Sequence, residues 1–150
     1  MISEGTLKKA IKGQKVLIDS NIIIYLTDSI QPYKPLAKLL FKMVESGDAE
    51  AVISILSIGE VMQGPIRKGL EHIAFEVRDY LVNFPNSYCQ DITFDVLDRI
   101  GRDTRINWQR LRTADSLIIA SGIYNNVDLI ISNDSHFKRS LPSNILISFD

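Results

Sequence analysis

The sequence lacks the features that mark several large classes of protein. Only one cysteine, Cys89, occurs among 150 residues, so the chain can form no intramolecular disulfide and no cysteine-rich zinc site. No apolar run approaches the roughly 20 residues that a membrane-spanning helix needs. The first residues also lack the continuous apolar core of a signal peptide. These absences predict a cytoplasmic protein that does not span a membrane.

The chain also lacks a strong excess of either charge. A net charge of −1 argues against binding nucleic acid through bulk positive potential alone. Carboxylates that hold divalent cations would nevertheless reverse the local field and attract phosphate. The sequence contains no internal repeat, low-complexity tract or linker, and its composition is that of an ordinary globular protein. Residues 1–150 are therefore predicted to form a single domain.

Apolar patterning predicts strands that alternate with helices. Short aliphatic strands are expected at 16–18, 49–54, 88–92, 128–132 and 144–149. Helices are expected at 22–26, 35–47, 56–64, 66–84, 94–106 and 111–126, and residues 1–14 carry an amphipathic helix pattern. Gly64-Pro65 is expected to end one of these helices. The alternation predicts an α/β fold, a sandwich of helices around a central, mainly parallel sheet.

Four acidic residues fall where such a sheet binds its ligands. Asp19 closes the first strand, Asp134 follows the strand at 128–132, and Asp115 opens the helix before that strand. Glu60 lies about two turns into the helix after the second strand. Ligands of open parallel sheets bind beyond the carboxyl ends of the strands. The four side chains are therefore expected to meet at one edge of the sheet.

A cluster of like charges is costly unless a cation neutralises it. Mg²⁺ suits this cluster because it prefers oxygen ligands and keeps bound waters that can be activated. Such a site hydrolyses phosphodiesters by lowering the pKa of a bound water and by stabilising charge on the attacking and leaving oxygens. The acids thus predict a metal-dependent nuclease.

Each acid also has a structural interpretation. Ser57-x-x-Glu60 is a capping-box pattern, Asp115 complements the dipole of a helix start, and the surroundings of Asp134 are typical of a turn. Asp19 is the hardest to explain in this way, since an acid at the inner end of a buried strand is costly without a role.

Several long segments resemble the PIN-domain family, in particular the small toxin ribonucleases of the VapC type. These segments are VLIDSNIIIYL, ISILSIGEVMQGPIR, LRTADSLIIASGIYNNVDLIISND and HFKR, so that the resemblance runs from residue 16 to residue 149. The acids and the asparagine that typify the family match, in chain order, Asp19, Asn21, Glu60, Asp115 and Asp134. The resemblance implies a PIN-like three-layer α/β/α sandwich and an endoribonuclease that uses Mg²⁺ or Mn²⁺. It also implies frequent homodimers and often a small antitoxin partner.

This hypothesis gives the site residues distinct roles. Asp19, Asp115 and Asp134 are predicted to bind the metal directly or through water, while Glu60 orients a water or the attacking nucleophile. Three neighbours are predicted to hold these carboxylates in place, namely Asn21, Thr113 and Asn133.

The densest basic region is a group of arginines around Trp108. Its members are Arg99, Arg102, Arg105, Arg110 and Arg112. The group is either a solvated surface or a contact surface for the RNA backbone, with base stacking on Trp108. Arg112 is the closest of the group to Asp115 in sequence and is predicted to bind RNA. His72 and His136 are expected to be surface or loop residues rather than ligands.

Two alternative functions remain open. The first is a catalytically degenerate PIN module that binds RNA or protein without cutting. The second is an unrelated α/β phosphohydrolase that uses an aspartate nucleophile on small phosphate esters. Such enzymes usually carry a second acid close to the first, whereas Asn21 stands two residues after Asp19 here.

Overall fold

The structure is a computed structural model that describes residues 1–150. Its elements are, in chain order, α1 (Glu4–Ile11), β1 (Lys15–Ile18), α2 (Ser20–Thr27), α3 (Lys34–Glu45), β2 (Glu50–Ser54), α4 (Ile55–Arg67), α5 (Glu71–Val82), β3 (Ser87–Gln90), α6 (Phe94–Leu97), the 3-10 turn η1 (Trp108–Arg110), α7 (Thr113–Tyr124), β4 (Leu129–Ile131), α8 (Ser135–Ser140) and β5 (Leu146–Ile147). None of the helices is long and apolar enough to span a lipid bilayer.

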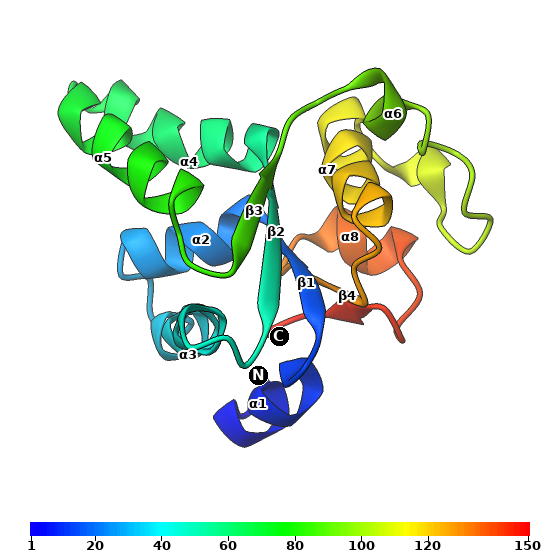
Figure 1. Cartoon of the computed structure of the whole chain (residues 1–150), viewed down its shortest axis with the longest axis horizontal. Helices are drawn as coiled ribbons and strands as arrows, with labels where there is room; N and C mark the ends of the chain where they lie inside the picture. Colours follow the sequence, from blue (N-terminus) through cyan, green and yellow to red (C-terminus); the bar gives the residue numbers. More distant parts are fainter.

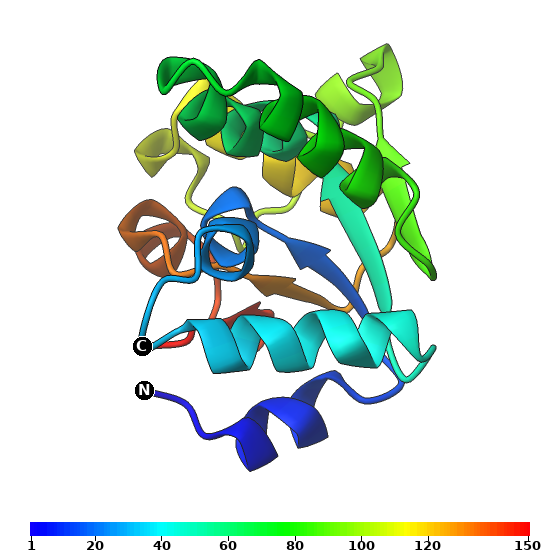
Figure 2. The ribbon, with the colours of Figure 1, turned by 90° about the vertical axis from the view of Figure 1, so that its left-hand side faces the viewer.

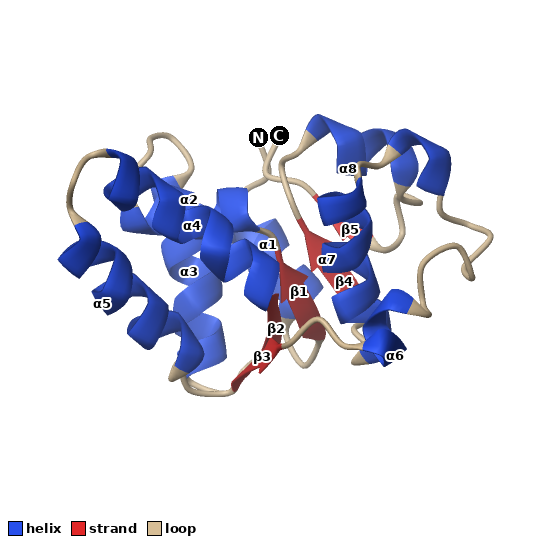
Figure 3. Ribbon diagram, turned by 90° about the horizontal axis from the view of Figure 1, so that it is seen from above, coloured by secondary structure: helices blue, strands red, loops and turns tan.

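The strands form one parallel sheet in the order β3-β2-β1-β4-β5. Helices α2 to α5 lie on one side of this sheet, and α6, α7 and α8 lie on the other (Figures 1 and 3). The three-layer α/β/α sandwich that the sequence predicts is therefore confirmed, with every strand pair parallel.

Alternation along the strands divides the core between the two faces. In β1, Val16 and Ile18 join a cluster of 21 buried residues under α1 to α5, whereas Leu17 joins a cluster of 8 under α7 and α8. Val52 in β2 likewise points to the smaller cluster. Successive side chains of a strand face opposite sides, so a strand buried on both faces reads as a continuous aliphatic run.

The helical hairpin α4–α5 corrects two predicted boundaries. Gly64-Pro65 does not end α4, which continues to Arg67. Proline removes one backbone donor and its ring crowds the carbonyl four residues earlier, that of Val61, and α4 continues for only two residues beyond Pro65. The chain breaks instead at Gly69, whose φ of 71° is a left-handed conformation that glycine adopts without strain. The second helix therefore starts at Glu71 rather than at Ile66.

The predicted helix at 94–106 is also mostly wrong. Thr93 caps a helix as its type suggests, because its hydroxyl accepts from the N–H of Val96 at 3.3 Å, but α6 has only 4 residues. Gly101 then takes a φ of 83°, and the remaining residues form turns. Helix α8 was not predicted, because its 6 residues are too few to show a helical period.

Helix α1 ties the N-terminus to the body of the protein. Leu7 and Ile11 are fully buried in the larger core, and α1 lies beneath α3 (Figure 2). The N–H of Ile2 donates to the carbonyl of Phe149 at 2.8 Å, so the two termini lie side by side. The segment before β1 is therefore an integral part of this fold.

Candidate functional site

The order of the strands reverses at β1. The chain places β2 and β3 on one side of β1, and then returns to place β4 and β5 on the other side. The connections after β1 and β4 leave toward opposite faces of the sheet, and such a switch point is where open α/β sheets bind ligands. Asp19 directly follows β1, and the segment Ser132–Asp134 directly follows β4.

Asp19 is the most enclosed of the four predicted acids, with 4% of its surface exposed. Its Oδ1 accepts from the N–H of Ser20 at 2.8 Å. Its Oδ2 accepts from the hydroxyl of Ser132 at 2.6 Å and from the amide of Asn21 at 3.2 Å. Burial raises the pKa of Asp19 to about 6, although the bonds from Ser132 and Ser20 lower it. A nearby cation would therefore stabilise this carboxylate.

The two predicted asparagines join the ends of β1 and β4. Asn21 donates to Asp19, and its Oδ1 accepts from the N–H of Asn133 at 3.2 Å. The side chain of Asn133 turns the other way, where its amide donates to the hydroxyl of Tyr25 at 3.1 Å and its Oδ1 accepts from the hydroxyl of Ser148 at 2.7 Å. Asn21 thus positions Asp19 directly, whereas Asn133 contributes through its backbone.

Asp134 is half-buried and directly precedes α8. Its Oδ1 accepts from the N–H of His136 at 2.6 Å, so it caps this short helix. Its own N–H donates to the Ser132 hydroxyl at 3.1 Å, and that hydroxyl in turn donates to Asp19. One serine therefore links two of the predicted acids, and the capping bond leaves Oδ2 of Asp134 facing Arg112.

Asp115 is paired with Arg112. It is 5% exposed, and its Oδ2 lies 3.0 Å from Nε of Arg112 while its Oδ1 lies 3.3 Å from Nη2. The same arginine reaches to 3.8 Å from Oδ2 of Asp134. Thr113, the predicted positioning residue, is exposed and donates none of the bonds that Asp115 accepts.

Glu60 faces the same group from α4. Much of the residue is exposed, but partial burial raises the pKa of its carboxyl. The negative charges of Asp115 and Asp134 act in the same direction, and the positive charge of Arg112 opposes them. Glu60, Asp115 and Asp134 therefore interact electrostatically with Arg112, and Asp19 interacts with Glu60 and Asp134.

In this arrangement no three acid, histidine or cysteine side chains lie close enough together to hold a metal ion. The donors still fit a divalent ion in kind, because carboxylate oxygens are the ligands that Mg²⁺ prefers. The positive charge nearest Asp115 and Asp134 is the guanidinium of Arg112.

The structural interpretations of the acids have different outcomes. The capping-box interpretation of Glu60 is wrong, because Ser54 caps α4 and the hydroxyl of Ser57 is buried without a hydrogen-bond partner. Asp19, by contrast, caps α2. For such acids capping and a second role coexist, since a carboxylate has more acceptor sites than one cap uses.

Sequence reasoning missed Ser132. This residue is fully buried at the end of β4 and makes the shortest hydrogen bond to Asp19, across 113 positions of the chain. The only signal in the sequence was a serine between an aliphatic strand and an Asn-Asp pair, which is also common in turns.

The arginine group divides into two parts. Arg102 pairs with Asp98 at 2.8 Å, Arg105 pairs with Asp103 at 2.8 Å, and Arg99 lies over the ring of Tyr124. The indole N–H of Trp108 donates to the carbonyl of Asp103. These local contacts favour the solvated-surface interpretation for most of the group. Arg112 alone is paired with acids of the site.

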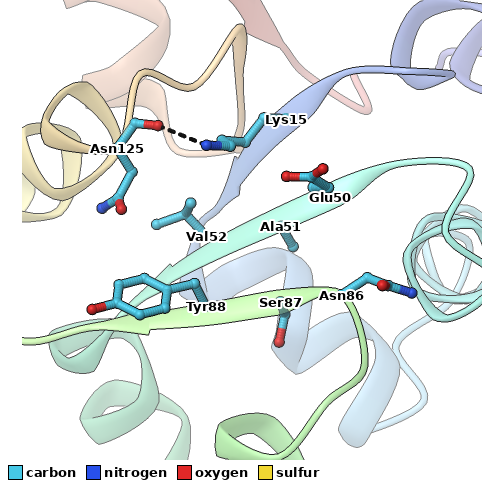
Figure 4. A pocket seen from close by; sticks show the side chains of 8 residues that line it. All are labelled: Lys15, Glu50, Ala51, Val52, Asn86, Ser87, Tyr88 and Asn125. Carbon is cyan, nitrogen blue, oxygen red and sulfur yellow. Dashed lines mark hydrogen bonds between the residues drawn. The ribbon is translucent and has the colours of Figure 1, made fainter.

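A hollow of about 300 Å³ lies at the other end of the sheet, where the strands begin (Figure 4). Its lining includes Lys15 and Glu50, the opening residues of β1 and β2, and Tyr88, the second residue of β3. The ammonium of Lys15 donates to the carbonyl of Asn125 at 3.1 Å. It contains none of the four acids. The candidate site is therefore the electrostatic cluster at the carboxyl end and not this hollow.

Solved structures share this fold at low sequence identity. VapBC2 from Rickettsia felis, bound to a DNA fragment from its promoter, has a TM-score of 0.63 and 20% identity over 91% of this chain and 99% of its own. DNA-bound VapBC from Salmonella typhimurium has a TM-score of 0.64 and 13% identity, with 91% and 99% coverage. VapC20 from Mycobacterium tuberculosis, described as a toxin that cleaves the sarcin-ricin loop, has a TM-score of 0.62 and 13% identity, with 83% and 93% coverage. These likenesses establish the fold.

Among curated protein sequences, none matches this chain. The PIN domain family matches residues 16–140, which include the switch point between β1 and β4 and all four acids. The match leaves α1 and β5 outside the shared region. On this evidence the chain belongs to the PIN-domain family.

Proposed function

We propose that this protein is a metal-dependent endoribonuclease that acts as the toxin of a toxin–antitoxin pair. One observation carries the proposal: a buried aspartate, Asp19, has a raised pKa and shares the switch point of the sheet with three more acids. Perturbed carboxylates in such a place are typical of catalytic centres. Membership of the PIN-domain family and the toxin named among the structural neighbours support the same function.

Under this proposal Asp19, Asp115 and Asp134 hold Mg²⁺, with Mn²⁺ as a substitute. When bound, the ion supplies an activated water and neutralises charge on the scissile phosphate. Ser132 and Asn21 fix the orientation of Asp19 through the hydrogen bonds that its Oδ2 accepts.

Glu60 and Arg112 take the remaining roles. Glu60 has a raised pKa and extends from α4, whereas Asp115 lies on α7. Glu60 is therefore suited to orient a water and to receive its proton. Arg112 has an exposed side chain on a helix start next to the acids, which suits it to contact an RNA phosphate.

A small antitoxin protein is the proposed partner. Several neighbours of the same fold were solved as VapBC or other toxin–antitoxin complexes, from Rickettsia felis, Klebsiella pneumoniae and Haemophilus influenzae among others. We also propose that the chain forms a homodimer. Size-exclusion chromatography with light scattering would test the dimer, and co-purification with the product of an adjacent reading frame would test the partner.

Replacing the central aspartate tests the enzyme proposal. Asp19→Asn removes a metal-binding charge but keeps the size of the side chain. Loss of groups that merely orient metal ligands costs about 10- to 100-fold in affinity or activity, so the loss of a ligand should lower Mg²⁺-dependent RNA cleavage by more than about 100-fold. Cleavage of a labelled structured RNA with and without EDTA measures the effect.

Glu50→Gln is the matched control, because it removes one negative charge at the opposite end of the sheet. Its cleavage rate should equal that of the wild type, and circular dichroism should show both variants folded. Full activity of Asp19→Asn would refute the assignment. Binding of RNA without any cleavage by the wild type would favour the degenerate module, and turnover of a simple phosphate ester alone would favour the phosphohydrolase.

A further inference from the structure

Arg112 is the only cation that pairs with the four acids. Five ion pairs occur in the chain, and the two that involve these acids both belong to Arg112. Its guanidinium forms a two-pronged contact with Asp115 and lies 3.8 Å from Asp134. Two carboxylates thus share one positive charge at the place where the family would hold a metal ion.

The two partners in this pair differ greatly in exposure. The Asp115 side chain is 7% exposed, whereas the Arg112 side chain is 65% exposed. The carboxylate is therefore held in the protein, while the long arginine side chain has solvent on most sides. A guanidinium in this position can leave the pair by rotating about its side-chain bonds, without any movement of the backbone.

We propose that Arg112 is the resident counter-ion of the carboxylate cluster in the metal-free protein, and that it must leave Asp115 before a divalent ion binds. This inference rests on the proposed function, because it assumes that the acids bind a metal. Both cations need the same oxygens of Asp115, so they compete.

The competition has a measurable consequence for metal affinity. An ion pair that is largely open to solvent contributes about 1 kcal/mol or less, which corresponds to about fivefold in an equilibrium constant. Arg112→Gln removes the competing charge and keeps a polar side chain of similar length. The variant should therefore bind Mn²⁺ more tightly than the wild type, by up to about fivefold, in isothermal titration calorimetry at low ionic strength.

Arg102→Gln is the matched control. Arg102 lies outside the cluster and pairs with Asp98. Its Nη2 donates to both carboxylate oxygens of Asp98, each at 2.8 Å. This variant has the same change in net charge and loses a similar pair, so its Mn²⁺ affinity should stay within about twofold of the wild type. A gain equal to that of Arg112→Gln would show a general charge effect and would overturn the inference.

The position of the side chain can be followed directly. In the metal-free protein the Nε–H of Arg112 donates to Asp115 at 3.0 Å, so its ¹⁵N signal should show slow exchange with water. The signal is identified by its absence in Arg112→Gln. Saturating Mg²⁺ should move it to the position and the fast exchange of a solvated arginine. A signal that keeps its slow exchange in the loaded protein would overturn the inference.

The same titrations separate this inference from the proposed function. If Asp19→Asn binds Mn²⁺ as tightly as the wild type, the acids are not the metal site and the proposed function fails. If Asp19→Asn loses binding but Arg112→Gln binds no more tightly than the wild type, the metal site stands and only the role of Arg112 as a competing counter-ion is wrong.

Discussion

The two ends of the parallel sheet are both polar, but they differ in how deeply their charged side chains are buried. At the amino end, Lys15 and Asp128 are joined by a hydrogen bond of 2.8 Å from backbone to carboxylate, and Glu50 remains exposed. At the carboxyl end, Asp19 is almost completely buried and carries a raised pKa. The amino end has a hollow that contains none of the four acids, whereas the carboxyl end has two buried carboxylates, Asp19 and Asp115, near the partly exposed Glu60 and Asp134. The candidate site is therefore distinguished by its buried, mutually repelling carboxylates rather than by a hollow.

Stability in the absence of metal should show the largest difference between the two ends. The folded protein binds a proton at Asp19 more tightly than the unfolded chain, because the pKa is raised from 3.8 to about 6. Stability due to this group is therefore greatest at low pH and falls as pH rises through that window, by about 3 kcal/mol. Asp19→Asn resembles the protonated form and escapes this loss.

Urea unfolding in EDTA at about pH 4 and about pH 7.5 measures most of this effect. The variant Asp19→Asn should gain stability relative to the wild type as pH rises, while Glu50→Gln at the amino end should follow the wild-type curve. If the free energies of unfolding of Asp19→Asn and the wild type changed equally with pH, burial of the Asp19 charge would cost no more than exposure of an acid at the amino end.

Removing the Ser132 hydroxyl should have the next largest effect. Ser132→Ala deletes the 2.6 Å hydrogen bond to Asp19, so RNA cleavage should fall by about 10- to 100-fold. That bond lowers the pKa of Asp19, so its loss raises the pKa and should move the acidic limb of the pH–rate profile to higher pH. Measuring kcat/KM across pH tests both effects.

Ser87→Ala is the control for this variant. The hydroxyl of Ser87 donates to the carbonyl of Phe84 at 2.8 Å at the amino end, so the variant loses a comparable hydrogen bond without touching an acid. Its pH–rate profile should match that of the wild type. A slower Ser132→Ala enzyme with an unshifted profile would show that the serine supports the fold but does not tune Asp19.

The smallest effect is expected at the hollow of the amino end. Tyr88 is 57% exposed, so Tyr88→Ala should change the free energy of unfolding by no more than about 0.5 kcal/mol and leave RNA cleavage unchanged. Chemical denaturation and the cleavage assay measure the two quantities. A tenfold loss of cleavage would show that the amino end contributes to RNA cleavage, and the two ends would then not differ in function.

Much of the fold could be predicted because its signals are local. The strands at both sides of the switch point and the buried helix α7 follow from aliphatic runs and from the residues that bound them. Helix ends were less predictable. Gly64-Pro65 and Gly69 both resemble stop signals, and only packing of α4 against its neighbours decides which one ends the helix.

The candidate site divides in a similar way. The identity of the four acids and their expected placement at one edge came from the ends of the predicted strands and from motif spacing. Their partners could not be found in that way, because Ser132 is remote from Asp19 in sequence and Arg112 reaches Asp134 only across the fold. Thr113, chosen for its place next to Asp115, makes no bond to it.

The sequence by itself determined the chemistry that is available to this protein: aliphatic strands that end in acids, an N-terminal helix and a family to which the chain belongs. Tertiary structure decided which acids are buried, that Ser132 donates a hydrogen bond to Asp19, and that Arg112 pairs with Asp115. The physical reason is that desolvation and ion pairing depend on every segment that closes around a group. Local sequence patterns record only the neighbours along the chain.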